Sequence, residues 1–519
     1  MALLLAAGAV VAGSLAVGLE APAREPTRRT PPATATAAPH PAPAAPATTA
    51  AVATTTTPAT TTGLAMPTPP PLGWSTCAPD RQCSTLVVPI DYDAPGGADI
   101  GIALRRRPAS DPAQRIGSLI LNPGGPGGSG IATLDQDLSL LPASVLDHFD
   151  VIAFDPRGIG ASDALHCTGD AYNGPDPDPD PQTPAAVATL LAADRSYAAA
   201  CARAGGALLA HLGTADVARD MEELRIAVGD RGLTYLGISY GTFLGAQYAV
   251  MFPTHVRAMV LDGAIDPSLT TEQLADAQAQ GFEQSLEAFF AWCRASGCSW
   301  RPAGDPHTAF QAIAASLRAH PLVVGSQTLG PAQFYTGTFG TLYARSFWPS
   351  LARGLAAAAA GNGAPMLGLY NGYEHAGDPT FDGDTNNAIT CLDHPVPTDP
   401  ALYGARAARA AALAPDFGAL LAWGGLTCAV WPVADSARRV PAPAHAPGSP
   451  PIMVVGTTGD PATPYAWAQA LASQLEHGVL LTRVGQDHVA IFYSTCVRSW
   501  DAQYLVNLEA PPGGTVCPS

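Results

Sequence analysis

Basic side chains are scarce in this chain of 519 residues. Only 26 Lys and Arg stand against 43 Asp and Glu, which gives a formal net charge of −17. No basic run is present that could follow a phosphate backbone, so neither nucleic acid nor an anionic membrane surface is an expected partner. Gly is abundant, with 52 residues, and a single glycine-containing motif is therefore weak evidence on its own.

The ten cysteines contain no C-x-x-C pair with zinc-like spacing, and nothing else in the sequence calls for a metal or an organic cofactor. In an exported chain an even set of cysteines indicates disulfides, whereas in a chain that is not exported they would be buried thiols. Closeness along the chain favours the pairs Cys77–Cys83, Cys293–Cys298 and Cys496–Cys517, which leaves Cys167–Cys201 and Cys391–Cys428.

The N-terminus lacks the basic residues that usually begin a signal peptide. Residues 1–23 are otherwise an apolar run that ends in Ala-Pro-Ala, a small-x-small cleavage pattern. We expect a cleaved signal peptide and a protein that is secreted or associated with the cell wall, with no membrane span after processing. The alternative is an uncleaved anchor at the lower limit of spanning length. Residues 24–72 are almost entirely Pro, Ala and Thr and predict an extended linker.

Short apolar runs bounded by Gly and Pro follow the linker. Residues 117–125 (GSLILNPGG) and 149–158 (FDVIAFDPRG) are nearly continuous apolar runs, as expected for strands buried on both faces of a sheet. Residues 214–228 have apolar positions at helical spacing, with Thr214 as a candidate N-cap and Gly229 as a candidate stop. The alternation of strand and helix predicts a mostly parallel α/β sheet with helices on both faces.

Residues 235–245, YLGISYGTFLG, place Ser239 between Gly237 and Gly241. The run LTYLGI before this serine predicts a strand, and TFLGAQYAVMF after it predicts a helix. A nucleophile elbow needs this strand, a sharp turn and this helix, with small residues on either side of the nucleophile. Ser239 is therefore the candidate nucleophile of a hydrolase.

Between residues 267 and 446 the pattern is mainly helical, and the β signal returns with IMVVG and GVLLTRVG. The returning piece of about 70 residues holds only two strands and could scarcely fold alone. The sequence thus predicts one α/β sheet interrupted by an inserted helical cap rather than two independent domains. The expected parts are a signal peptide (1–23), a linker (24–72), a first part of the core (73–266), the cap (267–446) and a second part of the core (447–519).

A serine hydroxyl needs a base and a third group that orients this base. In α/β-hydrolases the chain order is Ser, then Asp or Glu, then His, each after a strand. Asp460 follows IMVVG and His488 follows GVLLTRVG, so both match this order. Asp262 also follows a strand and is the rival acid, and His394 in the cap is the rival base. Asp487 is next to His488 in sequence. Because neighbouring side chains seldom face one another, Asp487 is not expected to orient the histidine.

Attack on a carbonyl also needs donors for the oxyanion. We expect one to be the backbone N–H of Tyr240 and the second to come from the loop LNPGGPGGSG (121–130), with Gly125 as the donor. No Lys-Ser/Thr follows this loop, which excludes a Walker phosphate site, and the acidic residue of a dinucleotide fingerprint is missing.

Four segments together, NPGGPGGSG, DPRGIGASD, GISYGTFLGAQYAVMFPTHVRAMVLDGAIDPS and GDPATPYAWA, resemble the secreted actinobacterial tripeptidyl aminopeptidases. These are proline-iminopeptidase-like serine peptidases with an α/β-hydrolase fold, and the resemblance runs from about Trp74 to the C-terminus. It implies Ser239, Asp460 and His488 as a triad that cleaves short peptides from a free amino end. Here GQDHVA lacks the Gly that relatives have directly before the His. Asn-Pro in the glycine loop, where iminopeptidases have His, argues against simple proline iminopeptidase activity.

An aminopeptidase must bind an ammonium group, and Glu374 and Asp393 in the cap are the candidate carboxylates, although both could be solvated surface charges. The leading hypothesis is an exported serine exopeptidase acting on peptides. A carboxylesterase or lipase acting on a small ester is the alternative, and a binding protein without catalytic activity on the same scaffold is the third. The oligomeric state is not indicated.

Overall fold

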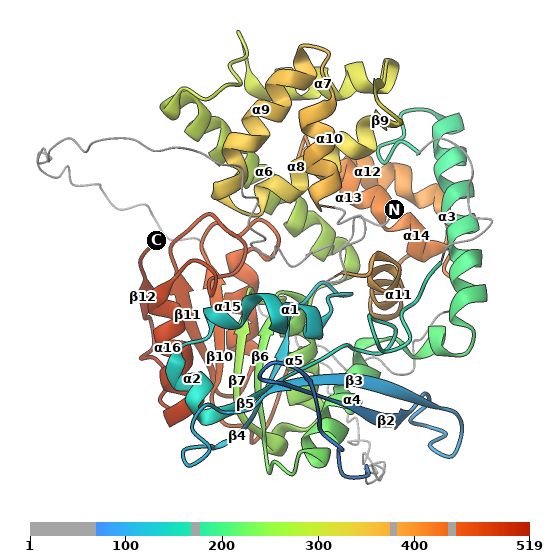
Figure 1. Cartoon of the computed structure of the whole chain (residues 1–519). Coiled ribbons are helices and arrows are strands. Elements are labelled where there is room, and N and C mark those ends of the chain that lie inside the picture. Colours follow the sequence, from blue (N-terminus) through green and yellow to red (C-terminus); the bar gives the residue numbers. More distant parts are fainter. Residues whose placement is uncertain (1–68, 168–176, 374–380, 434–442) are drawn as a thin grey trace, which may run out of the picture. The chain divides into compact units, whose positions relative to one another are not determined.

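The computed structural model of the chain describes residues 69–167, 177–373, 381–433 and 443–519 (Figure 1). The predicted signal peptide and the predicted linker up to residue 68 lie outside the described residues.

Within these ranges, ten strands form one sheet, and its larger part is parallel. Strands β1 to β3 and the β3–β5 pair are antiparallel, and the pairs from β5 to β12 are parallel. The order across the sheet is β1-β2-β3-β5-β4-β6-β7-β10-β11-β12. The bounds are β1 (Ser75–Ala78), β2 (Arg81–Pro89), β3 (Asp99–Arg107), β4 (Gly117–Asn122), β5 (Phe149–Phe154), β6 (Leu233–Ile238), β7 (Val256–Asp262), β10 (Ile452–Thr457), β11 (Gly478–Arg483) and β12 (Val516–Cys517).

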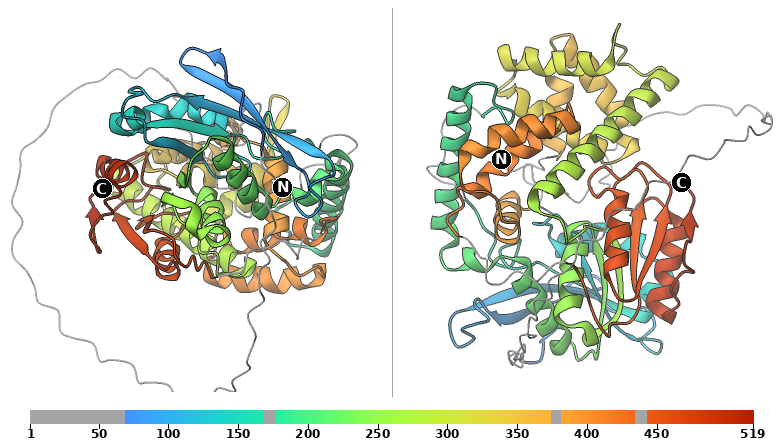
Figure 2. Two further views of the ribbon diagram at one scale, coloured as in Figure 1. Left: turned by 90° about the horizontal axis from the view of Figure 1, so that it is seen from below. Right: turned by 180° about the vertical axis from the view of Figure 1, so that it is seen from behind.

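Helices cover both faces of the sheet, as predicted (Figures 1 and 2). Side chains alternate between the faces along a strand: Leu236 and Val260 share a buried cluster with α16, whereas Tyr235 and Leu261 lie against Gly245 of α5. The helices beside the sheet are α1 (Gly130–Asp137), α2 (Ala143–His148), α4 (Thr214–Ala227), α5 (Tyr240–Met251), α15 (Tyr465–Gln474) and α16 (Thr495–Asn507).

The segment between β7 and β10 is helical and has a core of its own. Its centre is a cluster of buried aromatic side chains that includes Phe282, Phe289, Phe310, Phe339 and Trp348. The elements are α6 (Thr271–Ser296), α7 (Pro306–Ala319), β8 (Leu322–Val324), β9 (Gln327–Leu329), α8 (Pro331–Leu342), α9 (Trp348–Ala359), α10 (Ala364–Tyr373), α11 (Gly383–Asp393), α12 (Tyr403–Leu413), α13 (Gly418–Gly424) and α14 (Leu426–Ala429). Short 3₁₀ turns lie at Leu138–Leu140, Leu208–His211, Pro253–His255, Arg345–Phe347 and Pro400–Leu402.

Helix α3 (Pro184–Gly205) precedes β6 in the chain, yet it packs with these later helices. Leu190 of α3 shares a buried cluster with Tyr403 and Trp423. The sequence pattern did not predict this helix.

The predicted N-cap of α4 is wrong by one residue. Thr214 is the first residue of the helix, and Gly213 holds the cap position. The reason is a tertiary contact, because the carboxylate of Asp393 accepts hydrogen bonds from the backbone N–H of Thr214 at 2.9 Å and from its hydroxyl at 2.5 Å. An acceptor from a distant segment thus replaces a local cap.

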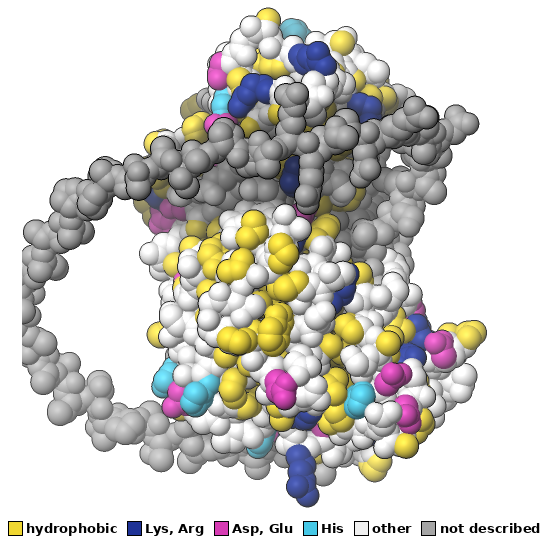
Figure 3. All heavy atoms as spheres, turned by 90° about the vertical axis from the view of Figure 1, so that its left-hand side faces the viewer, with side chains coloured by type: hydrophobic (Ala, Val, Ile, Leu, Met, Phe, Trp, Pro, Cys, Tyr) yellow, Lys and Arg dark blue, Asp and Glu magenta, His cyan; other side chains and the backbone are white. Residues whose placement is uncertain are grey.

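All ten cysteines form disulfides, in the pairs Cys77–Cys83, Cys167–Cys201, Cys293–Cys298, Cys391–Cys428 and Cys496–Cys517. No helix among the described residues is long and apolar enough to cross a membrane. On the face drawn in Figure 3, Lys and Arg side chains are scattered singly rather than gathered in a patch.

Candidate active site

Ser239 lies at the turn between β6 and α5. Its backbone has φ 56° and ψ −120°, a strained conformation for a residue with a side chain and one that aims the serine out of the turn. A Cβ at Gly237 would lie 2.3 Å from the carbonyl oxygen of Gly241, and a Cβ at Gly241 would lie 2.8 Å from that of Asn122. These close backbone approaches explain why glycine stands on each side of Ser239.

His488 and Asp460 lie in the loops after β11 and β10 and contact each other directly. Nδ1 of His488 is 2.9 Å from Oδ1 and 3.0 Å from Oδ2 of Asp460. The hydroxyl of Thr463 and the backbone N–H groups of Thr463 and Val489 also donate to this carboxylate, at 2.8 to 2.9 Å. The carboxylate is thus held beside the imidazole, and Nδ1–H is the natural donor to it, which leaves Nε2 as an acceptor.

The ends of β6, β7, β10 and β11 bring Ser239 and His488 to the same edge of the sheet. The backbone N–H of Ser239 donates to the carbonyl of Asp262 at 2.8 Å. A Cβ on Gly263, the next residue, would lie 3.5 Å from Cε1 of His488. Ser239 Oγ and His488 Nε2 are both buried, and neither has a hydrogen-bond partner among the described residues. The hydroxyl of Ser239 and Nε2 of His488 therefore lie in one buried region, both without a partner among the described residues.

Asp262, the rival acid, does not contact the His488 ring by a hydrogen bond within the described chain. Its carboxylate accepts from the backbone N–H of Ala490 at 3.0 Å and of Ile491 at 2.7 Å, and so it holds the segment that follows His488. Burial raises the pKa of Asp262 to about 6.

The other two rivals also have contacts of their own. Asp487 pairs with Arg483 at 2.8 Å and accepts from the backbone N–H of Arg345 at 2.9 Å. His394 is buried with its ring 5.4 Å from that of Phe243 on α5.

The glycine loop after β4 lies against the turn that carries Ser239. A Cβ at Gly124 would lie 3.1 Å from Cβ of Ser239 and 3.2 Å from the backbone nitrogen of Tyr240. Gly124 and Gly125 have φ of 97° and 109°, which side chains disfavour. Tyr240 is the first residue of α5, so its N–H has no acceptor within the helix. Gly125 and Tyr240 are thus on the two segments that meet at Ser239.

Three contacts with the helical segment, which the sequence analysis missed, hold this site. The amide of Asn386 on α11 donates to the carbonyl of Pro126 at 2.7 Å, and the N–H of Asp382 donates to that of Gly127 at 2.8 Å. The carbonyl of Tyr343 accepts from the N–H of His488 at 2.7 Å. These partners are far apart along the chain, and no local pattern signals them.

Of the two carboxylates predicted to bind the substrate's ammonium group, only Asp393 is among the described residues. Glu374 lies outside the described residues. Asp393 is bound to Thr214, and the hydroxyl of Thr214 in turn contacts the phenol of Tyr240 directly after Ser239. Asp393 is therefore linked to the Ser239 region through Thr214.

Comparison with known proteins agrees with this architecture. The family model described as alpha/beta hydrolase fold matches residues 117–494, which is more than half of the chain. The chain is 36% identical over 483 residues to the serine protease Hip1 of Mycobacterium tuberculosis, covering 86% of this chain and 91% of that protein.

Two further relatives have other named activities. Carboxylesterase B of Mycobacterium tuberculosis is 37% identical over 464 residues, covering 84% of this chain and 86% of the relative. The tripeptidyl aminopeptidase of Streptomyces lividans is 30% identical over 477 residues, covering 86% of each chain. With this fold and these relatives, the chain is a serine hydrolase, and it belongs to the α/β-hydrolase serine peptidase family.

Proposed function

We propose that Ser239, His488 and Asp460 form the catalytic triad of an exported serine exopeptidase that removes di- or tripeptides from free N-termini. One observation carries this proposal: His488 Nδ1 is bound to Asp460, while His488 Nε2 and Ser239 Oγ are both buried without a partner in the described chain. This is the arrangement that a nucleophile, its base and an orienting carboxylate require.

In this mechanism Ser239 Oγ attacks the scissile carbonyl while His488 Nε2 takes the hydroxyl proton. His488 then gives this proton to the leaving amine, and water releases the peptide from the acyl-enzyme by the same steps. Asp460 accepts from Nδ1–H and stabilises the imidazolium. The N–H groups of Tyr240 and Gly125 donate to the oxyanion, which is supported by the loop packed against Ser239.

Peptide substrates are favoured by the relatives named serine protease and tripeptidyl aminopeptidase. Cap carboxylates supply the ammonium site in this proposal, with Asp393 as the described candidate and Glu374 as the second. The five disulfides support export, because such bonds persist in oxidising compartments.

A carboxylesterase is the alternative, and one observation favours it. One relative is named carboxylesterase B. A cavity of about 50 Å³ beside the Ser239 turn is lined mainly by apolar side chains, among them Leu121, Pro123, Ile238 and Phe492. Such a lining suits the apolar part of an ester as well as an apolar peptide side chain.

A substrate panel separates these functions. The exopeptidase predicts release of the chromophore from a tripeptidyl p-nitroanilide with a free N-terminus and a loss of at least about tenfold in kcat/KM when this terminus is acetylated. Asp393→Asn should raise KM for the free peptide and leave the acetylated one unchanged. Turnover of p-nitrophenyl esters without amide cleavage would assign the esterase function instead.

A further inference from the structure

A second group of titratable side chains lies within the helical cap, at α6, α7 and the connection between α12 and α13. Glu283 and Glu287 are one turn apart on α6, His307 is in the first turn of α7, and Asp416 precedes α13. Nδ1 of His307 is 2.5 Å from Oδ2 of Asp416 and 3.8 Å from Oε1 of Glu283. Nε2 of His307 is 2.8 Å from Oε1 of Glu287. Two carboxylates thus converge on one ring nitrogen, and a third carboxylate binds the other.

This group carries more negative charge than its histidine can balance. Three carboxylates surround one imidazole, so the net charge is negative even when His307 is protonated. Among the described residues, no arginine forms an ion pair with any of these carboxylates.

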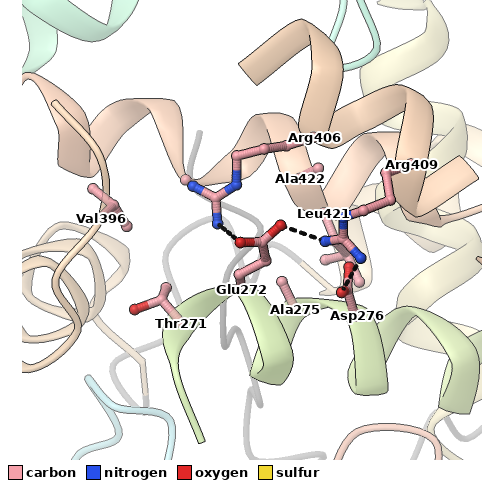
Figure 4. A pocket seen from close by; sticks show the side chains of 10 residues that line it. Thr271, Glu272, Ala275, Asp276, Val396, Arg406, Arg409, Leu421 and Ala422 are labelled. Carbon is pink, nitrogen blue, oxygen red and sulfur yellow. Dashed lines mark hydrogen bonds and ion pairs between the residues drawn. The ribbon is translucent and has the colours of Figure 1, made fainter. Parts of the chain in front are cut away.

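In the N-terminal part of α6, the negative charges of the carboxylates are balanced by arginines (Figure 4). There Glu272 lies 2.5 Å and Asp276 lies 2.7 Å from the guanidinium of Arg409, and Arg406 is 3.6 Å from Glu272. The same helix therefore pairs its N-terminal carboxylates with two arginines and leaves its middle carboxylates with one histidine.

Within this group, the carboxylate of Asp416 has an oxygen atom that lacks a hydrogen-bond partner among the described residues. Its side chain has no exposed surface, and its Oδ1 has no hydrogen-bond partner in the described part of the chain. Its backbone N–H donates to Oε2 of Glu283 at 3.1 Å, which holds the two carboxylates together. A buried carboxylate oxygen without a donor is costly, and a cation between these groups would satisfy it.

We propose that Glu283, His307 and Asp416 bind a divalent transition-metal ion of the zinc class, through His307 Nδ1 and one oxygen of each carboxylate. One such atom from each residue lies within 4.8 Å of the others. Ligands at about 2.0–2.2 Å from a shared ion are separated by up to about 4.4 Å, so a small side-chain rotation closes the site. Binding releases the Nδ1 proton.

The surroundings fit such an ion. Nε2–H of His307 donates to Glu287, the second contact that metal-bound histidines commonly make. The nitrogen ligand favours zinc over calcium and magnesium, which prefer oxygen alone. The side chains of His307 and Glu283 are 25% and 13% exposed, so two of the three ligands reach solvent. The ring of Phe290 packs 4.9 Å from His307, so the ion would fasten α6, α7 and the Asp416 segment around the aromatic core.

The test uses the purified full chain, treated with EDTA, desalted and then equilibrated with Zn²⁺ or Ca²⁺. The site predicts about one zinc retained per chain by elemental analysis, with the protein's Tm raised by roughly 2–5 °C in saturating Zn²⁺ and unchanged in Ca²⁺. Asp416→Asn should weaken zinc binding by at least about tenfold. The matched control is Asp276→Asn on the arginine-paired part of α6, which should bind zinc as the unaltered chain does.

Substoichiometric zinc in the unaltered chain, or full zinc binding by Asp416→Asn, would overturn the proposal. Far-UV circular dichroism of the metal-free variants checks their folding, and Glu283→Gln serves in place of Asp416→Asn if the latter does not fold. A Tm that depends on pH through His307 but not on zinc would assign the cluster to ion pairing alone.

Discussion

Asp460 joins the imidazole of His488 to the backbone of two loops. Its oxygens accept hydrogen bonds from Nδ1–H of His488 and from the backbone N–H groups of Ala462, Thr463 and Val489. In the proposed mechanism, its negative charge fixes the histidine tautomer and supports the imidazolium. A substitution that removes the charge and keeps the shape separates this role from packing.

Asp460→Asn is expected to lower kcat by about 10³–10⁴ because the amide no longer favours the productive tautomer. The measurement is kcat on the tripeptidyl p-nitroanilide, with Tm as a check on folding. Asp487→Asn is the matched control, since Asp487 is adjacent to His488 but binds Arg483 instead, and its kcat should stay within about tenfold of the unaltered chain. Equal losses in both variants would remove the special role of Asp460.

Chain order and position after a strand led to the prediction of Ser239, Asp460 and His488 as a group. The structure places Asp460 against His488, and the catalytic assignment stays a prediction. The same reasoning could not find Asn386 or Tyr343. Asn386 is 260 residues from Pro126, whose carbonyl it binds, and Tyr343 acts through its backbone carbonyl, which any residue could supply. A candidate catalytic side chain can be predicted from its place after a strand, whereas a contact to a distant backbone carbonyl leaves no such pattern in the sequence.

Helix α4 places four acidic side chains, Asp216, Asp220, Glu222 and Glu223, in buried positions. Asp220 binds the buried guanidinium of Arg157 at 2.6 Å. Glu222 pairs with Arg225 at 2.6 Å and accepts from Tyr248 at 2.7 Å. Oε1 of Glu223 has no hydrogen-bond partner within the described residues. Burial, together with the charges of Asp220 and Glu222, raises the pKa of Glu223 to about 7.

Glu223→Gln is therefore expected to stabilise the protein at pH 8. The pKa of Glu223 is higher in the folded than in the unfolded state. Its ionisation therefore destabilises the folded state as pH rises from about 4.5 to 7, and this destabilisation is complete above pH 7. The variant should raise Tm by a few degrees at pH 8 and leave it nearly unchanged at pH 4.5. Thermal unfolding at both values measures this difference.

Glu222→Gln is the control for that prediction. Because Glu222 is paired with Arg225 and Tyr248, its neutral variant should lower Tm at pH 8. A Glu223→Gln variant that is also destabilised at pH 8 would show that its carboxylate has a partner after all.

Strands were easier to predict than helices in this chain. The buried strands are short apolar runs between Gly and Pro, which mark both of their ends. Helix α3 is rich in Ala and has few large apolar residues to mark its buried face, and its partners Tyr403 and Trp423 come about 200 residues later. The start of α4 was displaced by one residue because Asp393, from a distant helix, satisfies Thr214.

At the scale of the whole molecule, one sheet is interrupted by a helical segment. This agrees with the prediction from the β signal that returns in the sequence after the helical stretch. The domain boundaries at residues 266 and 446 stay predictions, and α3 shows that the cap also draws on residues before β6. The disulfide Cys391–Cys428 joins α11 to α14, and its two cysteines are 37 positions apart in the sequence. Since α11 also carries Asn386, this bond connects the stability of the cap to the glycine loop.

Replacing both Cys391 and Cys428 by Ser is expected to lower the free energy of unfolding by about 3–4 kcal/mol, from loop-closure entropy. It should also lower kcat/KM, because α11 would be held less firmly and its Asn386 binds the glycine loop. Tm and the kinetics of the tripeptidyl p-nitroanilide measure the two effects.

The matched control replaces Cys77 and Cys83, a pair at the first two strands whose cysteines are only 6 positions apart in the sequence. It should cost less stability and leave kcat/KM unchanged. An equal loss of kcat/KM in both double variants would contradict the connection between α11 and the site.

The most direct test of the proposed mechanism is labelling with a fluorophosphonate probe, followed by mass spectrometry of the modified peptide. The account predicts one labelled residue, Ser239, with hydrolysis blocked in proportion to labelling. In Ser239→Ala, both labelling and turnover should disappear while Tm stays close to that of the unaltered chain. Labelling that persists in Ser239→Ala would contradict the assignment of Ser239 as the nucleophile.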